Sequence, residues 1–386
     1  MQGRRERVKP GGRGNRRQRI EKKVRAGISA ICIACLLLLL SGCSVLTGKT
    51  GTSAGTDSAG ETGVSESEAA GDSETDSGNE KEIVLGVSLN SLRSPFMIAL
   101  KQGIQEAADE LGIEIIVSNC NGNLQTQSNQ IRDFIVQEVD GILMEPLDAD
   151  ALIEVVEEAG EAGIPVYCVD TTVNSDTVTC TIGSDSVEMG RMAAEYIVEC
   201  LYEKYGEYRG KVVNLLASVT TTSGLNRSIG FHEVIDQYPD IEIVAEQNGA
   251  LQLDTAMNVM TNILQANESV DAIWCSGDTN AQGSLQAMKW LGRLYTVEEE
   301  EHIILVSADG AAESLTAIRE GTMDACISQN PLAMGRMAVE MMVESLRTGE
   351  EPEESFYAYP LFTITRDNID SQELEEYGIW SEEIES

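Results

Sequence analysis

The chain has 386 residues, of which 42% are apolar, so it is long enough for two domains with a sizeable core. Its formal net charge is −37, and its first 25 residues hold eleven of the 27 Lys and Arg residues but only two of the 64 acids. The rest of the chain is therefore strongly acidic and would repel a phosphate backbone, which excludes nucleic acid as an expected partner.

The N-terminus has the pattern of an export signal. A basic stretch over 16–25 precedes an apolar run over 26–40, which is shorter than the roughly 20 residues of a membrane span. The run leads into Leu-Ser-Gly-Cys at 40–43, which resembles the bacterial lipobox. We therefore predict a signal peptide over 1–42 and lipid attachment at Cys43. The anchor would hold the protein on the outer face of the cell membrane, or in the periplasm if the host has an outer membrane.

A change of composition follows the predicted anchor. Residues 44–80 are nearly all Gly, Ser, Thr, Ala, Asp and Glu, with almost no large apolar side chain. Such a segment cannot bury enough surface to fold, so we expect a flexible acidic linker over 43–82.

The cysteines beyond the anchor show no CxxC pair and no metal-ligand spacing, and four of them adjoin apolar, strand-like runs. Buried Cys behaves as a small apolar side chain, so we expect most of them to be free thiols. They are Cys120, Cys168, Cys180, Cys200, Cys275 and Cys326.

From residue 83 onward, short apolar runs alternate with helical patterns. The predicted strands are 83–89, 114–118, 141–144, 166–169, 179–183, 211–216, 241–247, 272–275, 303–308 and 325–328. The clearest helical patterns cover 97–111, 124–138, 187–203, 257–265 and 334–346. This alternation indicates parallel sheets covered on both faces, with too many βα units for one sheet of ordinary width. We therefore predict an α/β fold of two doubly wound lobes.

Polar side chains follow most of these strands, at the edge of the sheet where ligands bind in such folds. Carboxylates accept hydrogen bonds from hydroxyl groups, and amides both donate and accept them, which suits a neutral polyhydroxylated ligand. Helix capping is the alternative, because Asp, Asn and Ser are also favoured where helices begin. For a single residue the two interpretations are evenly balanced, and the whole set favours ligand binding.

The ordered series of junction motifs resembles the type I periplasmic binding proteins of the ribose- and galactose-binding kind, over about 83–369. The series includes Ser-Pro-Phe-Met at 94–97, Glu-Pro-Leu-Asp-Ala-Asp at 145–150, Gly-Ile-Pro-Val at 163–166, Ile-Gly-Ser-Asp at 182–185, Asn-Arg-Ser-Ile-Gly-Phe at 226–231 and Ser-Gln-Asn-Pro at 328–331.

This resemblance implies two flavodoxin-like lobes joined by a three-strand hinge, with a ligand trapped between them by hinge closure. The N-terminal lobe would comprise 83–184 plus 330–357. The C-terminal lobe would comprise 185–328 plus 358–370, followed by an acidic tail over 371–386.

The resemblance also implies site residues. Phe96 would stack on a sugar ring, while four polar side chains would hydrogen-bond the ligand, namely Asp170, Arg227, Asp309 and Gln329. The sequence departs from the ribose-binding pattern where Glu145 replaces Asn, Thr171 replaces Arg and Met97 replaces an aromatic residue. The predicted pocket is therefore more acidic and less aromatic than a ribose site, which leaves another monosaccharide, a polyol or an amino-bearing ligand. The full predicted set is Ser94, Phe96, Met97, Glu145, Asp170, Arg227, Asp278, Asp309 and Gln329.

The resulting functional hypothesis is a substrate-binding lipoprotein of an ABC importer. As a monomer, it would deliver a small polar ligand, most simply a monosaccharide, to the permease subunits. The alternative is an extracellular sensing protein that presents its ligand to a sensor kinase or chemoreceptor. Repressors of the lactose type share the fold implied by the resemblance, but they carry a DNA-binding head at the N-terminus. Here the predicted signal peptide and acidic linker occupy that position, which excludes the repressor class.

We expect neither an enzyme nor a bound cofactor or metal. The sequence has no GxSxG elbow and no HExxH motif. Carboxylates that face each other across a cleft could suggest a glycosidase, but in the resembling fold they bind sugar without cleaving it. The three tryptophans, Trp274, Trp290 and Trp380, are interpreted as packing residues.

Overall fold

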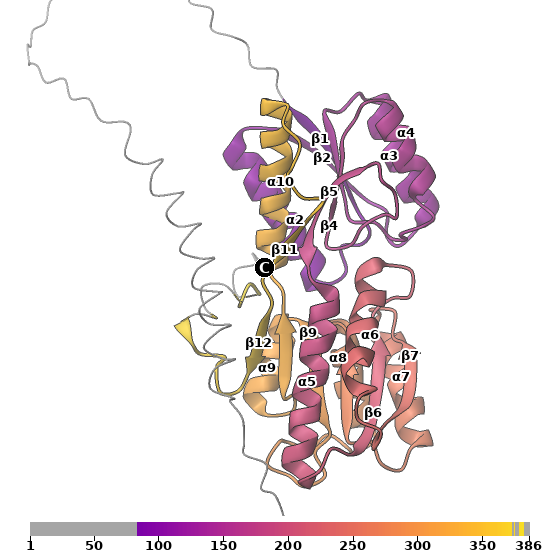
Figure 1. Ribbon diagram of the computed structural model, residues 1–386, viewed down its shortest axis with the longest axis vertical. Coiled ribbons are helices and arrows are strands. Elements are labelled where there is room, and N and C mark those ends of the chain that lie inside the picture. The colour runs from indigo at the N-terminus through magenta and orange to yellow at the C-terminus, as the bar shows by residue number, and fades with distance from the viewer. Residues whose placement is uncertain (1–82, 373, 375–377, 382–386) are drawn as a thin grey trace, which may run out of the picture. The chain divides into compact units, whose positions relative to one another are not determined.

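The computed structural model describes residues 83–372, 374 and 378–381; the predicted signal peptide, Cys43 and the acidic linker lie outside these residues. Two six-stranded sheets lie within residues 83–372, and helices cover both faces of each (Figure 1). The α/β fold of two doubly wound lobes is therefore confirmed. No helix in these ranges is both long enough and apolar enough to cross a membrane.

The first lobe is built on a parallel sheet with the strand order β11-β5-β4-β3-β1-β2. Its strands are β1 (Val84–Leu89), β2 (Glu114–Asn119), β3 (Gly141–Met144), β4 (Val166–Val169), β5 (Val178–Ser184) and β11 (Phe356–Tyr359). One face packs against α2 (Pro95–Leu111) and α10 (Pro331–Thr348), and the other against α3 (Leu124–Val136) and α4 (Ile153–Glu161).

The second lobe repeats this plan with the strand order β12-β10-β9-β8-β6-β7, in which β12 is antiparallel to its neighbour. Its strands are β6 (Gly210–Leu216), β7 (Ile241–Asn248), β8 (Ala272–Cys275), β9 (Ile304–Asp309), β10 (Ala325–Ser328) and β12 (Phe362–Thr365). One face is covered by α5 (Ser186–Tyr205) and α6 (Thr222–Ile235), and the other by α7 (Leu253–Ala266), α8 (Asp278–Trp290) and α9 (Ala312–Glu320).

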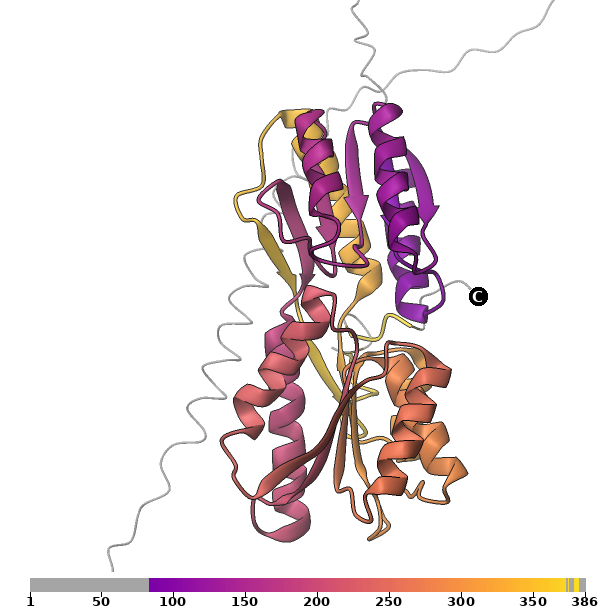
Figure 2. The ribbon, with the colours of Figure 1, turned by 90° about the vertical axis from the view of Figure 1, so that its right-hand side faces the viewer.

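Three connections join the two sheets: β5 leads to α5, β10 leads to α10, and β11 leads to β12. In Figure 2 the late-coloured α10 and β11 lie within the lobe that also contains the earliest helices. Each lobe is therefore assembled from segments far apart in the chain. The sequence pattern did not predict β11, because this four-residue edge strand has only exposed and half-buried side chains.

Polar caps begin the helices that follow several strands. Ser94 accepts a hydrogen bond from the Met97 N–H at 3.3 Å, and Asn330 accepts one from the Ala333 N–H at 3.0 Å. Proline follows each of these two caps at the first helical position, where a missing N–H costs nothing. Capping thus fixes where α2 and α10 start beside the strand ends.

Close backbone contact between α5 and α6 depends on two glycines. A Cβ atom on Gly230 would lie 1.8 Å from the carbonyl oxygen of Val187, and one on Gly190 would lie 1.9 Å from that of Arg227. The contact with α5 therefore sets the position of the α6 backbone at Arg227. In the first lobe, Gly103 allows the same approach of α2 to α10, where a Cβ atom would lie 1.9 Å from the Leu332 carbonyl oxygen.

The tryptophans divide into two buried residues and one exposed residue. Trp274 is fully buried and stacks on Phe231 with ring centroids 6.5 Å apart, and Trp380 is also fully buried. The prediction for Trp290 is wrong, because this side chain is 65% exposed. Trp290 lies two residues after the buried Met288 on α8. Residues two positions apart on a helix point in directions about 200° apart, so Trp290 faces away from the buried side of α8.

The segment assigned to an acidic tail is packed where it is described. Leu374 is buried in the apolar core beside β12, and Trp380 is buried against Ala99 and Ala311. Apolar burial therefore attaches this end of the chain to the folded part.

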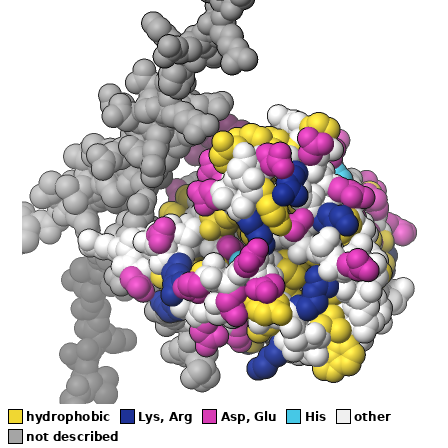
Figure 3. All heavy atoms as spheres, turned by 90° about the horizontal axis from the view of Figure 1, so that it is seen from below, with side chains coloured by type: hydrophobic (Ala, Val, Ile, Leu, Met, Phe, Trp, Pro, Cys, Tyr) yellow, Lys and Arg dark blue, Asp and Glu magenta, His cyan; other side chains and the backbone are white. Residues whose placement is uncertain are grey.

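All six cysteines beyond Cys43 are free, and only Cys200 is more than slightly exposed, as expected from their apolar surroundings. On the face of the second lobe seen in Figure 3, acidic and basic side chains are interspersed. This distribution fits the interpretation of the acidic composition as a contribution to solubility.

Gly230→Ala is expected to destabilise the fold by about 1–3 kcal/mol, because its Cβ atom would overlap a backbone carbonyl that cannot rotate away. The gain in helix propensity, at most about 1 kcal/mol, offsets only part of this cost. Urea unfolding measures the difference. Glu199→Ala, at an exposed position of α5, is the control and should change stability by less than about 0.5 kcal/mol. Equal effects of the two substitutions would contradict the assigned helix contact.

Candidate functional site

The strand ends of the two lobes line one cavity of about 690 Å³. Parallel strands bring their carboxyl ends to the same edge of a sheet, which is the usual ligand position in such folds. Each of the nine side chains predicted from the sequence lies at this cavity, namely Ser94, Phe96, Met97, Glu145, Asp170, Arg227, Asp278, Asp309 and Gln329.

Two aspartates occupy corresponding strand ends in the two lobes. Asp170 follows β4 with φ of 65°, and Asp309 ends β9 with φ of 91°. Residues other than glycine rarely adopt such positive values, which cost free energy and concentrate at functional sites. The backbone strain thus marks both aspartates as positions held by the surrounding structure.

Arg227 is the buried cation of the cavity. Its Nη1 lies 3.2 Å from Asp309 Oδ1 and donates a hydrogen bond of 2.8 Å to the Ser276 carbonyl oxygen. Gln329 donates from Nε2 to the same Asp309 oxygen at 2.8 Å. Arg227 Nε and Gln329 Oε1 are buried without a protein partner. The cluster therefore retains one donor and one acceptor for a ligand.

Trp380 supports this cluster from the far end of the chain. Its Nε1 donates a hydrogen bond of 2.8 Å to the Asp309 carbonyl oxygen. Its ring belongs to a small apolar cluster with Ala99 and Ala311, against which Phe96 packs. The sequence indicates only a packing role for Trp380, because nothing in its acidic sequence context points to a contact with the site.

Asp278 has a supporting position. Its carboxylate accepts hydrogen bonds from Ser307 Oγ at 3.0 Å, from the Ala311 N–H and from Ser314 Oγ. Removal from water raises its pKa to about 7, and the negative charge of Asp309 adds to the shift. Because protein donors already satisfy its oxygens, Asp278 fixes the turn into α9 rather than offering free acceptors.

The three residues predicted at the start of α2 lie at different depths. Ser94 caps the helix, Met97 is buried in the apolar core of the first lobe, and Phe96 is partly buried at the cavity. Only Phe96 among them presents an aromatic ring to the cavity.

Direct hydrogen bonds connect the lobes beside the cavity. Thr171 Oγ1 lies 2.7 Å from Thr222 Oγ1, and the Ala149 N–H donates to the Thr220 carbonyl oxygen at 3.0 Å. Thr171 was identified from the sequence only as the replacement of an arginine. The structure gives it a contact between lobes, which the sequence alone could not indicate because Thr222 lies 51 residues away.

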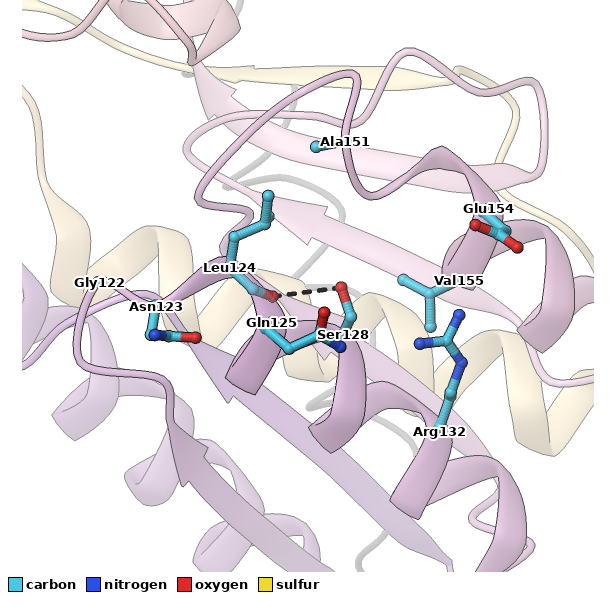
Figure 4. Close-up of a pocket in the computed structure, with 9 residues that line it drawn as sticks. All are labelled: Gly122, Asn123, Leu124, Gln125, Ser128, Arg132, Ala151, Glu154 and Val155. Atoms are coloured by element: carbon cyan, nitrogen blue, oxygen red, sulfur yellow. Dashed lines mark hydrogen bonds between the residues drawn. The ribbon is translucent and has the colours of Figure 1, made fainter.

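A second pocket, of about 500 Å³, lies beside α3 and α4 (Figure 4). The Ser128 hydroxyl donates to the Leu124 carbonyl oxygen at 3.2 Å, and Arg132 donates two hydrogen bonds of 2.7 Å to Glu158. These polar groups satisfy one another, so the cavity between the lobes is the better candidate site.

The chain is similar to known binding proteins along most of its length. A family model described as periplasmic binding protein domain matches residues 85–351. The chain is 30% identical over 266 residues to the ribose import binding protein of Bacillus subtilis, covering 69% of this chain and 82% of that protein. It is 29% identical over 273 residues to the D-allose-binding periplasmic protein of Escherichia coli, covering 68% and 85%.

A solved structure shares the fold of both lobes. It is an ABC transporter solute-binding protein from Bacillus halodurans with bound myo-inositol, and it matches with a TM-score of 0.69 at 24% identity. The match covers 77% of this chain and 99% of that one.

Asp170→Asn is expected to stabilise the protein above pH 6 and to leave its stability unchanged near pH 4. Burial raises the pKa of Asp170 to about 6, against a smaller opposing effect of the Arg227 charge. The folded state therefore binds the proton more tightly than the unfolded state, so wild-type stability falls as pH rises from about 4 to 6. Partial exposure to the cavity limits the gain at pH 8 to about 1–2 kcal/mol.

Thermal unfolding of both proteins between pH 4 and 8 tests this expectation. Asp254→Asn, at an exposed position of the same cavity, controls for the loss of one negative charge. A stability difference between wild type and Asp170→Asn that does not vary with pH would contradict the assigned environment of Asp170.

Proposed function

The chain belongs to the periplasmic binding protein family, and on this premise we propose that it is the substrate-binding lipoprotein of an ABC importer. It captures a small polyhydroxylated ligand, most simply a monosaccharide, between its lobes and delivers it to the permease subunits.

The observation that carries the proposal is the polar cluster formed by Arg227, Asp309 and Gln329. The Arg227 and Asp309 side chains are 4% and 11% exposed, and both lie at a cavity between strand ends. Buried charges are costly unless they are paired, as Arg227 and Asp309 are here. Within the cluster, Arg227 Nε and Gln329 Oε1 have no hydrogen-bond partner. Ligand hydroxyl groups can both accept from the former and donate to the latter.

The names of the relatives support the same ligand class. Two curated relatives are named for ribose and for D-allose, and a solved protein of the same fold holds myo-inositol. All three compounds are small rings with several hydroxyl groups. Phe96 offers this protein's cavity an aromatic surface on which such a ring can pack.

The connections between the lobes support capture by hinge closure. Among the described residues, only three chain crossings join the sheets, and hydrogen bonds from Thr171 and Ala149 hold the lobes together at the cavity. Closure around a ligand would bring both sets of strand ends into contact with it.

Membrane attachment through Cys43 completes the proposal. The basic stretch, apolar run and lipobox-like tetrapeptide favour a lipid anchor, and the acidic linker after it would give the lobes reach toward a permease.

Asp309→Asn is expected to lower sugar affinity by about 30-fold or more, because it removes one member of a buried, hydrogen-bonded charge pair. Isothermal titration with a panel of pentoses, hexoses and inositols measures the loss. Arg191→Ala is the control, since Arg191 also pairs with two acids but lies outside the cavity. Unchanged affinity in Asp309→Asn would disprove the assigned pocket.

Cys43→Ala is expected to move the protein from the membrane fraction to the soluble fraction, because the thiol that accepts the lipid is lost. Cell fractionation and immunoblotting measure the distribution. Cys200→Ala, which removes a partly exposed thiol of the folded part, should leave the protein with the membrane. Retention of the Cys43 variant at the membrane would refute the lipoprotein assignment.

A further inference from the structure

The cavity between the lobes carries an excess of acidic side chains. Counted over the whole residue, Glu145, Asp278 and Asp309 are each at most 7% exposed, and Asp170 lies beside them. Arg227 is the single buried cation among the described residues that line the cavity, whereas Arg93 at the same cavity is exposed.

Protein partners satisfy three of these four acids. Asp309 contacts Arg227 and Gln329, and Asp278 accepts three hydrogen bonds from the β9 and α9 region. The charge of Arg227 and hydrogen bonds from Ser223 and Gln329 lower the pKa of Asp170 and so favour its ionised form, although burial outweighs them.

Glu145 differs from these three acids. It is 3% exposed, and its Oε2 has no hydrogen-bond partner. The neighbouring Gln127 cannot supply one, because its Nε2 donates to the Glu145 carbonyl oxygen at 2.8 Å and to Ser88 Oγ at 3.4 Å, while its Oε1 accepts from the Leu147 N–H at 2.9 Å. The Glu145 N–H is also committed, to the Ser88 carbonyl oxygen at 2.9 Å. The carboxyl group is thus held in place at the cavity with an unsatisfied oxygen.

The charges around Glu145 favour a cation as the partner of its unsatisfied oxygen. Burial raises the pKa of Glu145 well above its usual range, the negative charge of Asp170 raises it further, and the Asn90 N–H opposes the shift. Burial raises the pKa values of the Cys120 and Cys168 thiols, and the charge of Glu145 adds to both shifts, so these thiols carry no charge at neutral pH. No positively charged side chain is among the causes of the Glu145 shift.

We propose, resting on the proposed function, that the preferred ligand is an amino-substituted sugar or polyol whose ammonium group binds between Glu145 and Asp170. The remaining hydroxyl groups of the ligand lie toward Arg227, Asp309 and Gln329. An ammonium group supplies three donors and one positive charge, which match two neighbouring carboxyl groups of which Glu145 has no cation among the causes of its pKa shift. A hydroxyl group at the same place would satisfy one oxygen but would bring no positive charge to the neighbouring Asp170.

A proton balance follows from this arrangement. Burial beside the negative charge of Asp170, with no cation among the causes, favours the protonated form of Glu145 in the free protein. When the ammonium group binds, Glu145 ionises to form the ion pair and releases that proton to the solvent. Binding of an amino ligand is therefore accompanied by release of up to one proton, whereas binding of its neutral counterpart is not.

Isothermal titration with matched ligands tests the inference. Glucose, galactose, mannose and myo-inositol are each compared with the counterpart in which one hydroxyl is replaced by an amino group, and the N-acetylated amines serve as uncharged controls. The best amino ligand should bind at least about tenfold more tightly than its hydroxyl and N-acetyl counterparts. Its apparent enthalpy should vary among buffers of different ionisation enthalpy, as proton release requires.

The variant Glu145→Gln should remove both the preference for the amino ligand over its neutral counterpart, measured as the ratio of the two affinities, and the proton release. Glutamine keeps the shape of the side chain and removes the buried acid, so the variant is expected to fold. The buffer dependence of the binding enthalpy of the wild-type protein is a second measurement, and it needs no variant. Asp254→Asn is the matched control, because it removes a carboxylate from the exposed part of the same cavity and should preserve the preference.

The outcomes separate this inference from the proposed function. Neutral sugars that bind as tightly as their amino counterparts would overturn the inference and leave sugar binding intact. Failure of both kinds of ligand would overturn both. Putrescine, tested as a cation without hydroxyl groups, should bind at least about tenfold more weakly than the best amino ligand; equal binding would refute the assignment to sugars or polyols.

Discussion

The pairing of Arg227 with Asp309 is the interaction around which the cavity is organised. Removing both charges from water is costly, and their attraction offsets that cost only when the geometry is good and other hydrogen bonds complete it. Here the completing groups come from three separate elements, the Ser276 carbonyl after β8, Gln329 after β10, and the indole of Trp380 on the Asp309 carbonyl. The glycine contact between α5 and α6 sets the position from which Arg227 reaches them.

The same cavity stores unfavourable free energy. Burial raises the pKa of Glu145, Asp170 and Asp278, so each acid is less stable in its charged form here than in water. Positive φ values at Asp170 and Asp309 add backbone strain. The fold tolerates these costs because two extensive apolar cores stabilise each lobe independently of the cavity. Binding sites commonly trade stability for function in this way.

Regular periodicity made most of the fold predictable. Buried strands such as β3 and β8 read as short, continuous apolar runs, and polar residues at the ends of strands marked the cavity before any contact was known. The edge strand β11 lacked that signal, because its side chains are only exposed or half-buried. Trp290 departs from the predicted packing role because its position around α8 turns it away from the buried side of the helix.

Contacts between distant segments could not be derived from local pattern. The bond between Thr171 and Thr222 and the support of Asp309 by Trp380 each join residues more than 50 positions apart. Likewise, the need for glycine at 190 and 230 becomes apparent only when the two helices are seen to cross. Local sequence therefore predicted which residues lie at the cavity, while the partners that hold them required the three-dimensional arrangement.

The three crossings between the sheets impose an order on biosynthesis. The first lobe lacks α10 and β11 until residues up to Tyr359 are available, and the second lacks β12 until Thr365. Neither half can therefore reach its final form as an N-terminal fragment, and the native contacts of both depend on large sequence separations, which slow folding. For the export that the proposed signal peptide implies, this delay would be useful, because a polypeptide that stays incompletely folded until β12 is available can still pass through a translocation channel.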